Sequence, residues 1–93
     1  MKNNLKYNYQ LSDIALEIIG KYVAERRKEL GYTQTEIAEK VGTIQNHISN
    51  FEKGKQNLSI KTFIAILGVL DLHLEFSYKD SDNLTGFPGV SKN

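Results

Sequence analysis

The chain has 93 residues, no cysteine and a formal net charge of +1. This length predicts one small domain, and the lack of cysteine excludes disulfide bonds and thiolate zinc sites. Because the net charge is close to zero, any DNA binding must come from a local positive patch and specific contacts.

Several classes of protein do not fit the pattern of residues. The longest apolar run, 63–70, is too short to span a bilayer, and residues 1–10 lack the apolar core of a signal peptide. We find no candidate nucleophile, paired-carboxylate site or phosphate loop, and His47 and His73 have no ligand-spaced partners. We therefore expect a cytoplasmic protein that is not an enzyme, with no membrane partner, small-molecule substrate, cofactor or metal.

The first third of the chain predicts an arm followed by a helix. Residues 1–11 are rich in Asn, Gln and Tyr and predict a flexible arm, and Ser12 is a plausible N-cap. Gly20 interrupts the helical pattern, so it either divides this region into two helices or only loosens one long helix. Gly31 ends the helix. Its apolar residues are Ile14, Ile18, Ile19, Tyr22, Val23 and Leu30.

Three shorter helices are expected before residue 71, which completes a helical domain over residues 12–71. Thr33 and Glu36 form a capping-box pattern at the start of the second helix, and Gly42 ends it. The third helix spans about 45–52, and Ser59 caps the fourth. The residues predicted to face inward are Ile37, Ala38, Val41, Ile48, Phe51, Phe63, Ile64, Ile66, Leu67 and Leu70.

The period of the apolar residues changes after Asp71 from helical to alternating. Residues 72–79 predict a half-buried strand, and residues 80–93 predict a disordered tail because they are rich in Gly, Ser, Asn and Asp. The apolar face of the strand carries Leu72, Leu74, Phe76 and Tyr78.

Residues 33–52 describe two short helices joined by a tight turn, as in a helix-turn-helix. Ala38 is small where the helices would touch, and Gly42 accepts the positive φ of the turn. The second helix of such a unit enters the major groove, where each base pair presents a distinct pattern of donors and acceptors. The alternative for any one polar residue is a solvated helix surface. The candidate DNA-binding residues are Gln34, Gln45, Asn46, His47, Ser49, Asn50, Lys53 and Lys55, with Lys40 a further phosphate contact.

The pattern R-K-E-L-G-Y-T-Q-x-x-I-A-x-x-V-G of residues 27–42, followed by Q-x-x-I-S-x-F-E of residues 45–52, resembles the lambda-repressor/Cro-like (XRE) helix-turn-helix family. The resemblance implies a mainly α bundle and a transcriptional repressor. It also implies an ion pair of Arg27 with Glu52, where the residues alone leave open a solubilising face at 26–28. Thr43 and Ile44 depart from the family pattern. Ile44 cannot cap a helix, so we expect it to touch a thymine methyl group.

A narrower resemblance, to HipB-like antitoxins, rests on I-S-N-F-E at residues 48–52, T-F-x-x-I-L at 62–67 and L-x-L-x-L at 70–74. It implies a homodimer in which the 72–79 strands pair between subunits, a palindromic double-stranded DNA operator, and a HipA-like serine/threonine kinase toxin as partner. Three alternatives stay open. The strand folds back on residues 7–11, or the protein is a stand-alone phage-type or restriction-controller repressor, or it neutralises a toxin without binding DNA.

Overall fold

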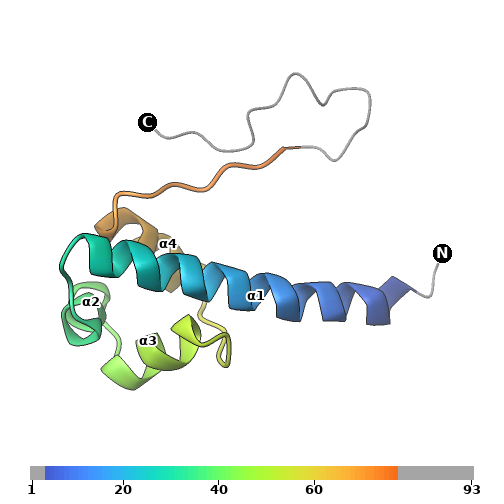
Figure 1. Cartoon of the computed structure of the whole chain (residues 1–93), viewed down its shortest axis with the longest axis horizontal. Helices are drawn as coiled ribbons and strands as arrows, with labels where there is room; N and C mark the ends of the chain where they lie inside the picture. The colour runs from blue at the N-terminus through green and yellow to red at the C-terminus, as the bar shows by residue number, and fades with distance from the viewer. Residues whose placement is uncertain (1–3, 78–93) are drawn as a thin grey trace.

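The computed structural model describes residues 4–77, and it describes side chains from residue 10 onward (Figure 1). It contains four helices, α1 (Asn4–Glu29), α2 (Gln34–Val41), α3 (Gln45–Glu52) and α4 (Ile60–Val69). Figure 1 shows that the three short helices gather beside the C-terminal half of α1. The expected mainly α bundle is therefore present. No helix within residues 4–77 is long and apolar enough to cross a membrane.

Helix α1 differs from the expectation at its start. It begins at Asn4, so residues 4–11, which we expected to form a flexible arm, are helical, and Ser12 lies inside the helix instead of capping it. The physical reason is that no glycine or proline occurs before Gly20 to end a helix. Gly20 does not divide the helix either. It packs so closely on α3 that an added Cβ would overlap the Phe51 carbonyl oxygen.

The core is a small cluster where the four helices meet. Its largest fully buried side chains include Ile37, Ile48 and Ile66, and the rings of Phe51 and Phe63 lie 5.8 Å apart. One residue predicted to face inward does not, since Ile64 is 53% exposed. The buried residues of the cluster are Val23, Ile37, Ala38, Ile48, Phe51, Ile66 and Leu70.

The helix ends follow the capping chemistry that the sequence predicts. Glu36 N–H donates to Thr33 Oγ1 (3.0 Å), and Thr33 N–H donates to Glu36 Oε1 (2.8 Å), so the capping box of α2 is confirmed. Ser59 caps α4 by accepting a hydrogen bond from Thr62 N–H at 3.1 Å. Gly42 ends α2 with a φ of 80°, in the left-handed region.

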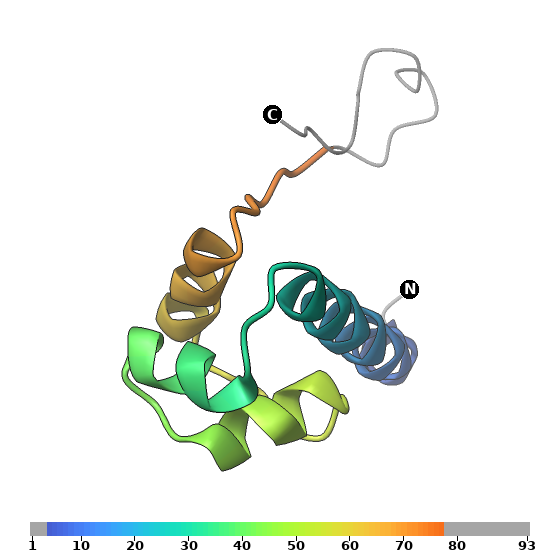
Figure 2. The same cartoon turned by 60° about the vertical axis from the view of Figure 1, so that its left-hand side comes forward.

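Residues 72–77 form neither helix nor strand in this single chain. Leu72 N–H donates to the Leu67 carbonyl at 2.8 Å, and no backbone hydrogen bond within the described part of the chain involves residues 73–77. The segment leads away from the bundle (Figure 2). It does not pair with residues 7–11, because those residues are helical. Pairing with a second copy stays a prediction, and Tyr78, residue 79 and the predicted tail of 80–93 lie outside the described residues.

Candidate nucleic-acid interface

The turn between α2 and α3 is fixed by backbone hydrogen bonds to one carbonyl. The N–H groups of Gly42 and Thr43 both donate to the Ala38 carbonyl, the second at 2.9 Å. Ala38 is buried, as expected of the small residue at the contact of the two helices. Ile44 precedes α3 and forms no side-chain cap, and its side chain is 56% exposed beside the start of the helix.

The outer face of α3 carries most of the predicted DNA-binding residues. Ile48 and Phe51 are buried, and a rotation of about 100° per residue places the first and second residues of the helix on the opposite side. Gln45 and Asn46 are exposed there. Ser49 and Asn50 share this side but are half-buried, and Lys53 and Lys55 are exposed just after the helix. We call the surface of Gln45, Asn46, Ser49, Asn50 and Lys53 the α3 outer face.

Side chains from the segments on either side of α3 hold His47 and Asn50. His47 lies at the edge of the outer face, half-buried, with its Nδ1 atom 2.9 Å from Thr43 Oγ1. This contact orients the imidazole ring and gives Thr43, a departure from the family pattern, a local role. Asn50 donates from Nδ2 to Gln56 Oε1 at 3.4 Å, which ties α3 to the loop before α4.

A buried ion pair joins α1 to the end of α3. Arg27, which is only 8% exposed, donates from Nε to Glu52 Oε2 (2.7 Å) and from Nη2 to Glu52 Oε1 (3.0 Å). Its Nη1 donates to the Tyr32 carbonyl at 2.9 Å. The expected ion pair therefore forms. Arg26 has different partners, because it donates to the Leu70 carbonyl at 2.9 Å and pairs with Glu29.

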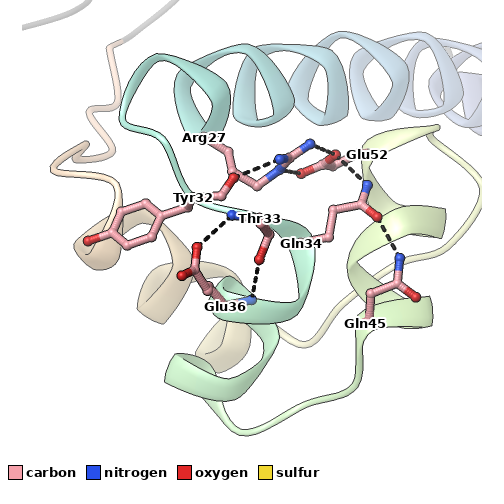
Figure 3. A network of polar contacts seen from close by, with 7 residues as sticks. All are labelled: Arg27, Tyr32, Thr33, Gln34, Glu36, Gln45 and Glu52. Atoms are coloured by element: carbon pink, nitrogen blue, oxygen red, sulfur yellow. Dashed lines mark hydrogen bonds and ion pairs between the residues drawn. The ribbon is translucent and has the colours of Figure 1, made fainter.

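The ion pair continues outward to the α3 outer face through two amide side chains (Figure 3). Gln34 Nε2 donates to Glu52 Oε1 at 2.9 Å, and Gln45 Nε2 donates to Gln34 Oε1 at 2.6 Å. Because a carboxylate only accepts hydrogen bonds, Glu52 holds the amide nitrogen of Gln34 inward and leaves its oxygen to accept from Gln45. Gln45 keeps its own carbonyl oxygen and one N–H for another partner.

This network is the feature of the site that sequence reasoning missed. The sequence placed Gln34 and Gln45 at the starts of two helices as independent DNA contacts, whereas Gln34 bridges Glu52 and Gln45 within the protein. The spacing of 18 residues between Gln34 and Glu52 carries no local signal of contact. Lys40 also has a partner within the protein, since its Nζ lies 5.8 Å from the centre of the Tyr32 ring.

Comparisons with known proteins place the chain in a family. A family model described as Helix-turn-helix (HTH_3) matches residues 23–77. The chain belongs to this helix-turn-helix family, which is of the XRE type. The matched residues of the HTH_3 family include α2, α3 and α4 in full and the last part of α1.

Several known proteins resemble the chain over part of their length. Antitoxin HipB of Escherichia coli O6:H1 is 46% identical over 48 residues, which cover 52% of this chain and 51% of that protein. Antitoxin HipB of Escherichia coli strain K12 is 44% identical over a stretch of the same length. The regulator SinR of Bacillus licheniformis is 35% identical over 72 residues, covering 74% of this chain and 65% of SinR. The chain spans about half the length of the HipB proteins that it matches.

Proposed function

We propose that the chain is a DNA-binding transcription regulator that reads base pairs in the major groove with the α3 outer face. Family membership supports DNA binding and transcription regulation as the class of function. One structural observation supports the more specific proposal that the α3 outer face reads base pairs. Helix α3 exposes Gln45 and Asn46 while it buries Ile48 and Phe51 on the other side, so amide groups project from the bundle in the arrangement that groove reading needs.

The chemistry of the outer face fits sequences that contain A·T base pairs. Adenine presents an N6 donor and an N7 acceptor in the major groove, and an amide side chain can bind both. The carbonyl oxygen and remaining N–H of Gln45 form such a complementary pair, because Gln34 has taken only one of its hydrogens. Asn46 supplies a second amide, and Ile44, which is exposed, is proposed to contact a thymine methyl group.

The residues at the ends of α2 and α3 are suited to bind DNA phosphates beside the major groove. Helices α2 and α3 begin at Gln34 and Gln45, and their free backbone N–H groups favour an approaching anion. Lys53 and Lys55 follow α3 and are exposed, so they are proposed to position the duplex against the helix without reading its sequence. His47 and Ser49 are proposed to contribute contacts at the edge of the groove.

We also propose that the protein acts as a homodimer on a palindromic operator. The support is the segment 73–77, which has no backbone hydrogen-bond partner within the described residues, together with Leu74 and Phe76, which are both exposed. Pairing between two copies, extended to Tyr78 and residue 79, would satisfy such an unpaired segment. The similarity to HipB antitoxins supports a role as the antitoxin and co-repressor of a HipA-type kinase toxin.

A second candidate is a stand-alone transcription regulator without a toxin partner. The match to SinR favours it, because it covers 74% of this chain, against 52% for each HipB protein. Co-expression with the product of the adjacent gene, followed by purification through one partner, separates the two candidates. A stable complex with a kinase-like protein supports the antitoxin, and a regulator that purifies alone supports the second candidate.

DNA footprinting tests the proposed function. DNA selected from a random pool by the purified protein is expected to contain two half-sites about one helical turn apart. Gln45→Ala is expected to lose the protection of bases in each half-site. Lys28→Ala serves as a control, because Lys28 is exposed on α1, and is expected to leave the footprint unchanged. No preference over random DNA would contradict the proposal and favour a protein-interaction role.

A further inference from the structure

Helix α1 exposes a row of large apolar side chains that are not part of the buried core of the bundle. Leu11, Ile14, Ile18 and Tyr22 follow one another at intervals of three and four residues, so they lie on one face of the helix. All four are exposed, with Ile18 at 62%. This row, which we call the α1 stripe, is about 17 Å long. Contiguous apolar surface of this kind marks an interaction site in soluble proteins.

The α1 stripe points away from the α3 outer face. Gly20 touches the backbone at the end of α3, and Ile18 lies two residues away, on the opposite side of the helix. The stripe therefore lies outside the proposed DNA contact. Leu11, Ile14 and Ile18 also precede the residues that the family model matches, so the helix-turn-helix fold itself does not explain them.

The α1 stripe ends beside the start of the C-terminal segment. Tyr22, at the end of the stripe, lines a surface groove together with Leu72, where the segment leaves the bundle. Leu74 and Phe76 follow along the segment, and Phe76 is 87% exposed. The stripe and the segment thus meet at this groove, whose lining also includes Glu25, Arg26 and Glu29. A helix face that the described residues leave exposed therefore lies next to a backbone whose residues 73–77 have no hydrogen-bond partner within the described part of the chain.

We propose that a second copy of this chain covers the α1 stripe, in the same symmetric interface that pairs the two 72–77 segments. The proposal extends the homodimer suggested under the proposed function. A second copy would supply both a partner for the unpaired backbone and a cover for the α1 stripe. Two paired segments form a ribbon that is only marginally stable alone, so this ribbon needs a helix face to pack on. A two-fold interface also brings the same patch of each subunit to its copy.

The extent of the exposed surface supports a second copy of the chain as the partner that covers the α1 stripe. A stable interface buries about 800 Å² per partner, and a ribbon with one short segment from each copy is small by that measure. The α1 stripe together with Leu74 and Phe76 gives six exposed large apolar side chains, which extend the interface along the helix. The dimer contact therefore includes the part of α1 that lies before the matched family region.

Sedimentation equilibrium of the full chain without DNA tests the proposal. The double variant Ile14→Glu, Ile18→Glu is expected to dimerise at least ~100-fold more weakly than the wild type, because two unpaired carboxylates from each subunit would be buried at the interface. Ile60→Glu is the matched control. Ile60 is 68% exposed at the first position of α4, and its variant is expected to dimerise like the wild type. A double variant as dimeric as the wild type would overturn the proposal, as would a monomeric wild type.

A second measurement keeps the test decisive if the double variant unfolds. The chain has no cysteine, so Ile18→Cys and Ile60→Cys each introduce a single thiol. The thiol at position 18 is expected to react with a maleimide at least ~10-fold more slowly above the dimer dissociation constant than below it, because the dimer would cover it. The thiol at position 60 is expected to react equally at both concentrations. Equal reactivity of position 18 would overturn the proposal, and DNA binding by such a protein would leave the proposed function standing.

Discussion

Removal of the Glu52 charge is expected both to destabilise the domain and to loosen the α3 outer face. The side chains of Arg27 and Glu52 are 10% and 6% exposed and form two hydrogen bonds. Breaking one partner of such a buried pair costs about 3–5 kcal/mol, since the other charge stays buried without its counter-ion. We expect Glu52→Leu to lower the free energy of unfolding by this amount, measured by urea denaturation.

The double variant Arg27→Met, Glu52→Leu separates stability from positioning. Replacing both partners with apolar side chains of similar volume is often neutral for stability, so the double variant is expected to recover most of the loss. It should still bind operator DNA about 2- to 10-fold more weakly, because Gln34 and through it Gln45 lose their anchor and must be ordered on binding. A loss below about 1 kcal/mol in Glu52→Leu, or wild-type DNA affinity in the double variant, would refute this reasoning.

Two further predictions concern stability and can be measured by the same denaturation. Gly20→Ala is expected to destabilise by about 1–3 kcal/mol through overpacking against the Phe51 carbonyl, although alanine is the better helix former. Gly68→Ala is the control, because the added Cβ would meet no atom within 4 Å apart from its chain neighbours and the backbone of its own helix, and it should stabilise by up to ~1 kcal/mol. Equal effects of the two changes would contradict the close packing of α1 on α3. Ser59→Ala is expected to cost about 1 kcal/mol by removing the α4 cap, and an unchanged stability would show that Thr62 N–H has another acceptor.

The sequence predicts most of the helical part of the fold, because the signals there are local. The capping box of Thr33 and Glu36, the left-handed Gly42 and the cap at Ser59 each involve residues a few positions apart, and the structure contains all three. The start of α1 was not predicted. Ser12 is a good cap residue, but nothing before it stops a helix, so the chain continues in helical form from Asn4.

Contacts between distant residues were harder to predict. The carboxylate of Glu52 binds both Arg27 and Gln34, which lie 25 and 18 residues earlier, and only the first contact was expected from the family resemblance. The role of Gly20 also depends on α3, because its lack of a side chain matters only where the two backbones meet. Apolar spacing alone did not distinguish a buried helix face from an exposed one, as Ile14 and Ile18 show.

Binding to operator variants with single base-pair changes tests the central claim most directly, namely that the α3 outer face reads the base sequence. Asn46→Ala is expected to weaken the free energy of DNA binding by about 1–3 kcal/mol through the loss of a contact at one base position. It should relax specificity at that position only. Lys53→Ala, the matched change at a proposed phosphate contact, should weaken binding to all sequences alike and reduce the salt slope by about 1. If Asn46→Ala instead weakened all sequences equally, or had no effect on any of them, α3 would not be the reading element.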